Sequence, residues 1–111
     1  MSSTTSSEIF NRIRHDIGSY DVVLYMKGSP AFPQDGFSAA VAQILDTLGV
    51  AYKDFDVLVD SGLRQAIKDY SNWPSTPQLY VKGEFIWGSD IVREMYQSGE
   101  LQALFKSKGL L

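Results

Sequence analysis

Asp35 is the residue best placed for chemistry in this sequence, because it ends a loop rich in glycine and proline and precedes an apolar stripe of helical spacing. A carboxylate there holds a negative charge beside the N-terminus of a helix and accepts a hydrogen bond from its first amides. It could also serve as a general base, although no partner acid accompanies it. A simple N-cap without a functional role is the third interpretation, and the residues alone leave all three open.

The absence of cysteine narrows the chemistry further. Since none of the 111 residues is a cysteine, the chain has no disulfide, thiol nucleophile or thiolate metal ligand of its own. The single histidine, His15, stands between Arg14 and Asp16 with no second ligand nearby, which favours a surface residue over a metal site. Arg64 and Lys68 lie one helical turn apart, and their spacing alone is more typical of a solvated helix face.

Length and composition indicate one domain over residues 1–111, with residues 1–6 expected to be flexible. The apolar fraction is 44% and the charged fraction 21%, which is ordinary for a chain that buries its own core. A formal charge of −3 gives no general attraction to nucleic acid or to an anionic membrane surface. We find neither a secretory signal nor a membrane-spanning window, and we therefore expect a cytoplasmic protein.

Hydrophobic periodicity and turn residues predict an α/β protein with the element order α-β-α-β-α-β-β-α-α. The strands are expected at residues 22–26, 50–57, 78–81 and 84–87. The first helix is expected at residues 6–17, and the second runs from the end of the 27–36 loop to Gly49. The third is expected after a cap at Asp60 or Ser61, and the fourth after a cap at Ser89 or Asp90. A fifth, short helix is expected after Gly99. A helix joins the first two strands, which predicts a parallel pair, and a hairpin at Lys82-Gly83 joins the last two. The expected architecture is a four-stranded mixed sheet flanked by helices.

Several short motifs fall in a fixed order along these elements. They are Lys27-Gly28-Ser29-Pro30, Pro33-Gln34-Asp35-Gly36-Phe37-Ser38, Asn72-Trp73-Pro74 with Pro77-Gln78-Leu79-Tyr80-Val81, Gly83-Glu84-Phe85, and Gly88-Ser89-Asp90-Ile91-Val92. In this combination the chain, from about Glu8 to Leu104, resembles a monothiol glutaredoxin of the Cys-Gly-Phe-Ser type. The resemblance implies a thioredoxin-like fold.

The resemblance also implies a cleft for glutathione, an anionic tripeptide with two carboxylates. Cations and the free N–H groups of a helix N-terminus suit such a ligand, and in this light Arg64 and Lys68 become ligand contacts. The peptide bond before Pro77 is implied to be cis, with the backbone of Thr76 pairing with the cysteinyl part of glutathione. Phe37 borders the cleft in the family, although it also begins an apolar stripe that favours the core. The implied glutathione contacts are Lys27, Phe37, Arg64, Lys68, Thr76, Pro77, Gly88, Ser89 and Asp90.

The sequence departs from the family pattern at the reacting centre. Asp35 stands where the family has the cysteine that exchanges with disulfides, or that ligates a two-iron, two-sulfur cluster shared across a homodimer with two glutathione molecules. A carboxylate cannot enter thiol–disulfide exchange, so we expect no deglutathionylation, and Asp35 as metal ligand predicts a weak or labile cluster at best. Thr76 replaces an apolar residue. Trp87 replaces a glycine, where it could narrow the cleft or offer a flat surface to another ligand.

Two main hypotheses follow for the function. The first is a monothiol glutaredoxin-like protein with a glutathione cleft, a family role in iron–sulfur cluster assembly and transfer and in redox homeostasis, and no thiol catalysis. The alternative is a non-catalytic interaction module that uses the cleft surface to bind a protein, as family members bind BolA-like partners. A third is an enzyme of new specificity that works through Asp35 and Trp87. Either engineering or natural divergence would place an aspartate at position 35.

Overall fold

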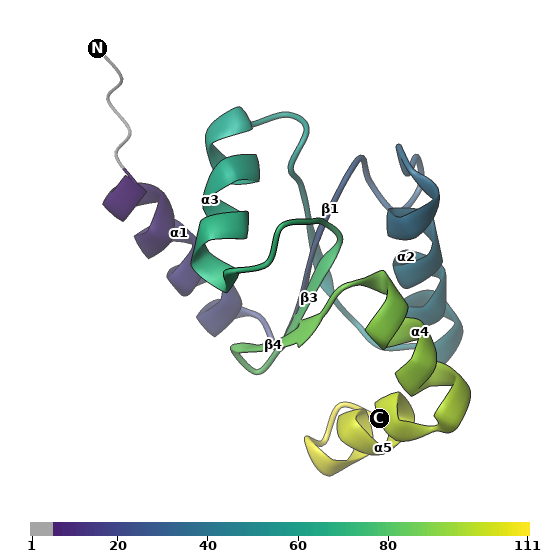
Figure 1. Ribbon diagram of the computed structural model, residues 1–111. Helices are drawn as coiled ribbons and strands as arrows, with labels where there is room; N and C mark the ends of the chain where they lie inside the picture. Colours follow the sequence, from purple (N-terminus) through teal and green to yellow (C-terminus); the bar gives the residue numbers. More distant parts are fainter. Residues whose placement is uncertain (1–5) are drawn as a thin grey trace.

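The computed structural model describes residues 6–111, with side chains from Glu8 onward. Figure 1 shows its elements coloured from purple at the N-terminus to yellow at the C-terminus. The expected flexibility of residues 1–5 lies outside the described residues, and Ser6 begins the first helix. The elements are α1 (Ser6–Ser19), β1 (Val22–Met26), α2 (Gly36–Leu48), β2 (Lys53–Asp56), α3 (Ser61–Ser71), β3 (Gln78–Val81), β4 (Glu84–Trp87), α4 (Ser89–Ser98) and α5 (Glu100–Ser107).

The four strands form one mixed sheet in the order β2-β1-β3-β4. β1 pairs with β2 in parallel and with β3 in antiparallel, where Tyr25 lies opposite Gln78. β3 and β4 are antiparallel neighbours joined at Lys82 and Gly83. The expected thioredoxin-like fold, a four-stranded mixed sheet flanked by helices, is therefore confirmed.

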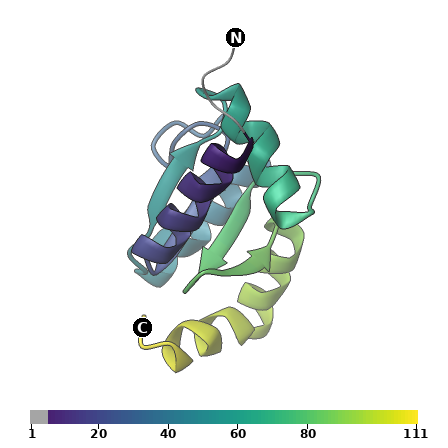
Figure 2. The ribbon, with the colours of Figure 1, turned by 90° about the vertical axis from the view of Figure 1, so that its left-hand side faces the viewer.

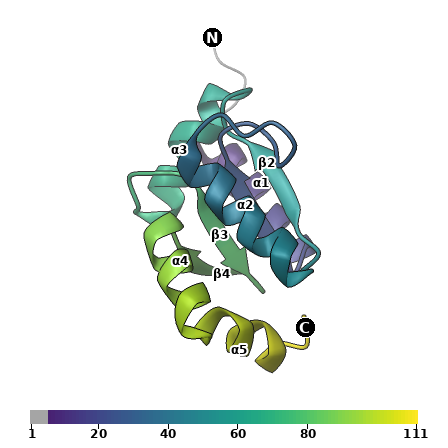
Figure 3. The same cartoon turned by 90° about the vertical axis from the view of Figure 1, so that its right-hand side faces the viewer.

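Helices cover both faces of the sheet, and the alternation of side chains along β1 divides the core between them. Val22, Leu24 and Met26 belong to the apolar cluster shared with α2, α4 and α5, whereas Val23 and Tyr25 belong to the cluster shared with α1 and α3. Figures 2 and 3 face the α1–α3 layer and the α2–α4 layer in turn. Within the described part of the chain, no helix has the length and apolar character needed to span a bilayer.

Two element boundaries differ from those expected. The second strand was expected at residues 50–57, but β2 is only Lys53–Asp56, because it pairs with β1 alone and that strand has five residues. The first helix was expected at residues 6–17, but α1 continues to Ser19, whose hydroxyl donates a hydrogen bond of 2.7 Å to the carbonyl of His15. Both changes are local and leave the sheet order unaffected.

The ends of α2 and α3 are fixed by capping residues. Asp60 caps α3, and its Oδ1 accepts a hydrogen bond of 3.1 Å from the amide of Leu63. That bond, with a second from the Arg12 guanidinium, holds the pKa of Asp60 below its usual value. Gly49 ends α2 in the left-handed conformation at φ 75°, as its position after the apolar stripe predicts.

The loop after β1 is held in shape by Gly28. This residue has φ 83°, and its amide donates a hydrogen bond of 3.0 Å to Oδ1 of Asp56 at the end of β2. A Cβ added at Gly28 would collide with the carbonyl oxygen of Phe32 and lie 2.8 Å from Gln34. The loop therefore folds back on itself so closely that only glycine fits here.

Gly28→Ala should lower the free energy of unfolding by about 2 kcal/mol or more. The alanine would have to adopt the left-handed backbone conformation, and its Cβ would also clash with the loop. Urea denaturation followed by circular dichroism measures this change. Gly18→Ala is the matched control, since Gly18 has no neighbour within 4 Å of an added Cβ and lies in α1. The control should be neutral or slightly stabilising, and equal effects of the two variants would contradict this account of the loop.

Candidate functional site

Asp35 is the N-cap of α2 and is also an ion-pair partner. Its backbone is extended, its Oδ1 accepts a hydrogen bond of 2.7 Å from the amide of Ser38, and its Oδ2 lies 3.6 Å from Nζ of Lys27. The two charged side chains are 23% and 30% exposed, so the pair faces solvent but is partly screened from it. The capping interpretation of Asp35 is therefore correct in geometry, and the carboxylate also carries a partner cation.

Ser38 ties the end of β1 to the first turn of α2. Its side chain is fully buried, and its Oγ accepts a hydrogen bond of 3.0 Å from the backbone amide of Lys27. Because the amide of Ser38 also binds Asp35, one residue holds both members of the ion pair in place. Sequence reasoning did not single out Ser38, and the available signal was a small polar residue within the apolar stripe of a helix.

The loop before β3 runs beside the end of β1. The peptide bond between Thr76 and Pro77 is cis, as the family resemblance implied. Tyr25 near the end of β1 lies opposite Gln78 at the start of β3, so the loop that begins at Lys27 and the loop that ends at Pro77 meet the sheet at the same edge. Thr76 is buried, and its hydroxyl has no hydrogen-bond partner among the described residues. The ion pair and the cis-proline loop therefore belong to the same edge of the sheet.

Gln78 holds this loop from beneath, and sequence reasoning missed it. Its side chain is fully buried, and its amide donates to the carbonyls of Ser75 at 3.1 Å and Trp73 at 3.4 Å. Its Oε1 accepts a hydrogen bond of 3.1 Å from the hydroxyl of Tyr80. Burial raises the pKa of Tyr80, so this hydroxyl stays a donor at neutral pH. The signal in the sequence was a polar side chain at the start of an apolar strand.

The N-terminus of α4 meets the same loop. The expected cap at Ser89 or Asp90 is wrong, because Gly88 is the N-cap and makes no side-chain hydrogen bond. Gly88 is buried so closely that an added Cβ would lie 3.2 Å from Trp73 Nε1 and 3.4 Å from the carbonyl oxygen of Pro77. A hollow of about 70 Å³ lies here, lined by Trp73, Ser75, Gly88, Ser89, Asp90 and Ile91.

The remaining predicted site residues are Phe37, Arg64 and Lys68, and they make no hydrogen bond or ion pair with Lys27, Thr76 or Gly88 among the described residues. Phe37 is 58% exposed on the first turn of α2, so of the two positions left open for it, the core is contradicted. Lys68 lines a separate hollow of about 320 Å³ together with Trp73. Arg64 is exposed on α3, one turn before Lys68, and its side chain has no hydrogen bond or ion pair within residues 8–111.

Trp87 takes a backbone conformation that glycine adopts more easily, with φ 104°. Its ring packs edge-on against Trp73 at 5.4 Å and lies 5.2 Å from Phe85, while 46% of the residue remains exposed. The hollow at the N-terminus of α4 is lined by Trp73 and not by Trp87. The ring therefore extends an aromatic surface behind the site.

The two roles of Asp35 can be separated by substitution. Asp35→Ala removes the cap and should cost about 1 kcal/mol of unfolding free energy, whereas Asp35→Asn keeps a capping oxygen and should cost less than about half of that. Urea denaturation of the three proteins measures the difference. If the asparagine variant is as unstable as the alanine variant, the ion pair with Lys27 and not the cap stabilises this end of α2.

Known proteins place this site in a family. The glutaredoxin family profile matches residues 22–86. An uncharacterized monothiol glutaredoxin ycf64-like from Synechocystis is 50% identical over 86% of this chain and 89% of its own length. The solution structure of reduced poplar apo GrxS14 has a TM-score of 0.77 at 45% identity, covering 87% of this chain and 89% of that one.

A more distant structure shares the fold alone. The buckwheat glutaredoxin–glutathione complex has a TM-score of 0.85 at 18% identity, covering 100% of this chain and 99% of that one. The family profile, the relative at 50% identity and the observed fold agree with one another. The chain therefore belongs to the glutaredoxin family and groups with its monothiol members.

Proposed function

We propose that this chain binds glutathione at the end of β1 and performs no thiol chemistry. The observation that supports the proposal is the continuity of one band of residues across three elements. Lys27 pairs with Asp35 after the end of β1, the cis-proline loop meets the sheet at the same edge, and Pro77 of that loop lies close to Gly88 at the start of α4. An anionic ligand laid along this band would meet a cation, an open backbone edge and the amides of a helix N-terminus in turn.

In this proposal the two carboxylates of glutathione occupy opposite ends of the band. One approaches the ammonium of Lys27, and the other approaches the first amides of α4, in the hollow beside Ser89 and Asp90. The backbone of Thr76 pairs with the cysteinyl part between them, while Phe37, Arg64 and Lys68 surround the tripeptide. The buckwheat glutaredoxin was solved with glutathione, which supports the capacity of this fold to hold it.

Asp35 changes the electrostatics of this site as well as its chemistry. The carboxylate lies 3.6 Å from Nζ of Lys27, so a ligand carboxylate must share that cation with a fixed negative charge. Like charges at close range oppose each other, and the binding of glutathione is weakened by the same ion pair that orients Lys27. Removing the charge while keeping the capping oxygen should therefore strengthen binding.

Calorimetric titration with reduced glutathione tests this proposal. The unmodified chain should bind, Asp35→Asn should bind several-fold more tightly, and Lys27→Gln should bind about tenfold more weakly. Arg14→Gln is the matched control, because Arg14 is exposed on α1 and bonds only to Asn11 among the described residues. Absence of binding heat in both the unmodified chain and Asp35→Asn, at several temperatures, would refute the glutathione site.

The family's two-iron, two-sulfur cluster does not fit the donors present. The Asp35 carboxylate is already engaged by Ser38 and Lys27, and hard oxygen suits such a cluster less well than thiolate sulfur. We therefore propose that this chain holds a labile cluster at best, with the family role in cluster transfer correspondingly reduced.

Asp35→Cys should restore what the aspartate removes, because the helix N-terminus and Lys27 would favour a thiolate there. Anaerobic reconstitution with iron, sulfide and glutathione, followed by visible absorption and gel filtration, should give a stable coloured dimer with Asp35→Cys only. Asp35→Ser is the control for simple loss of the carboxylate and should stay colourless. A stable cluster on the unmodified chain would contradict the role assigned to Asp35.

An exposed apolar surface supports protein binding as a second candidate function. Phe32, Leu58 and Val59 are exposed by 74%, 44% and 80%, and they stand on the loops that follow β1 and β2, near exposed Phe37. These loops are joined, since the amide of Val57 donates to the carbonyl of Met26 at 2.9 Å. Exposed apolar patches often bind other proteins, so a BolA-like partner would be expected here if glutathione gives no heat.

A further inference from the structure

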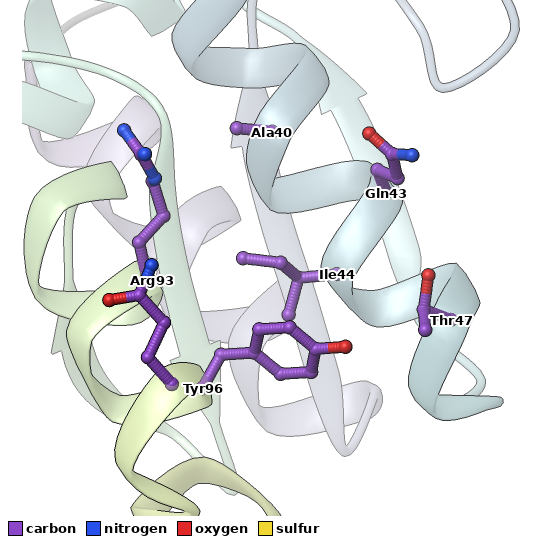
Figure 4. Close-up of a pocket in the computed structure, with 7 residues that line it drawn as sticks. Ala40, Gln43, Ile44, Thr47, Arg93 and Tyr96 are labelled. Atoms are coloured by element: carbon purple, nitrogen blue, oxygen red, sulfur yellow. The ribbon is translucent and has the colours of Figure 1, made fainter.

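A groove lies between α2 and α4, and none of its lining residues belongs to the proposed glutathione site. Its volume is about 300 Å³, which is the lower end of the range for small-molecule sites. Figure 3 shows the two helices side by side, and Figure 4 shows Ile44 of α2 and Tyr96 of α4 extending toward each other between them. The lining residues are Ala40, Gln43, Ile44, Thr47, Arg93, Tyr96 and Gln97.

The floor of the groove is apolar and firmly held. Ile44 is only 8% exposed and belongs to the core cluster beneath α2, and Tyr96 is half-buried against the same cluster. Figure 4 shows the Tyr96 ring extending from α4 toward Ile44, where its face can cover a flat apolar group. Ala40 has only a methyl side chain and leaves the space between the helices open.

The rim of the groove is polar and has no partner. Among the described residues, Arg93 makes no ion pair and the side chains of Gln43, Thr47 and Gln97 make no hydrogen bond. The carboxylates of Asp90 and Glu94 border a neighbouring hollow with Arg93, but neither forms an ion pair with it. The chain has a net charge of −3, and Arg93 is a cation without an ion-pair partner among the described residues, close to the apolar side chains of Ile44 and Tyr96. A ligand with an apolar part and an anionic group could therefore contact these side chains and pair with Arg93.

We propose that this groove binds a small planar apolar molecule bearing one carboxylate. The apolar body lies on Ile44 beside the ring of Tyr96, the carboxylate pairs with the guanidinium of Arg93, and Gln43 and Gln97 donate from the rim. This site shares no residue with the proposed glutathione site, so each proposal can be tested independently of the other. The volume of about 300 Å³ fits a molecule of one or two fused rings.

The probe that tests this proposal is 2-naphthoate, titrated into isotope-labelled protein and followed by amide chemical shifts. Saturable shifts should centre on Ile44, Arg93 and Tyr96. Two analogues should each bind at least about tenfold more weakly. 2-naphthalenemethanol has the ring system but no charge for Arg93, and acetate has the carboxylate but no ring system for Ile44 and Tyr96. Shifts centred on residues 27–38 instead, or no saturation below millimolar concentrations of 2-naphthoate, would overturn the proposal.

Two variants and one control complete the test. Arg93→Gln should weaken 2-naphthoate binding by about tenfold through loss of the charge pair. Ala40→Leu should abolish binding by filling the groove, and its thermal transition shows whether the fold is retained. Arg14→Gln should bind as the unmodified chain does. Equal affinities for all four proteins would show that the probe binds elsewhere and would refute the site.

Discussion

The site depends on the bond between the first turn of α2 and the end of β1. The amide of Lys27 donates to the buried hydroxyl of Ser38, while the amide of Ser38 donates to Asp35. A strand and a helix that are separated by a loop of nine residues are thereby joined at the point where the functional side chains project. Since β1 is buried throughout and pairs on both sides, this junction also sets the position of the cis-proline loop and of α4. The resemblance implies a cysteine at position 35 in the family, and aspartate, which is a favoured N-cap residue, keeps that junction in this chain.

The ion pair at the junction explains why a carboxylate is tolerated at a position adapted to sulfur. A helix N-terminus and a nearby ammonium stabilise negative charge, whether it resides on a thiolate or on Asp35. The same environment therefore accepts the substitution without strain. What changes is the availability of the cation, because the carboxylate keeps its charge beside Lys27 throughout, whereas a thiolate loses its charge when it is protonated or joined in a disulfide. Without a cysteine the chain has no sulfur chemistry of its own, and the weaker anion binding that we propose follows from the carboxylate of the same residue, Asp35.

Most of the fold could be predicted from the sequence, because its signals are local. The apolar stripe ending at Gly49 and the turn at Lys82-Gly83 each depend on neighbouring residues only, and both are as expected. The errors concern features that tertiary contacts decide. Gly88 caps α4 at a point where Trp73 and Pro77 approach its backbone closely, since an added Cβ would lie 3.2 Å from Trp73 Nε1, and nothing in its flanking residues indicates that approach. Gln78 was missed for the same reason, since its partners belong to a loop that the sequence does not place.

The aromatic residues show how the chain accommodates change beside the site. A non-glycine residue at φ 104° costs on the order of 1–3 kcal/mol, yet Trp87 lies at the end of an edge strand, where its ring can pack on Trp73 and Phe85. Trp73 in turn is fixed by the hydrogen bond from Gln78 to its carbonyl. Because Gln78 anchors the loop that holds Trp73 from the core, the ring of Trp87 packs on Trp73 and Phe85 and not on the cis-proline. The backbone edge of Thr76 can therefore keep its place beside a tryptophan at position 87, where the resemblance implies a glycine.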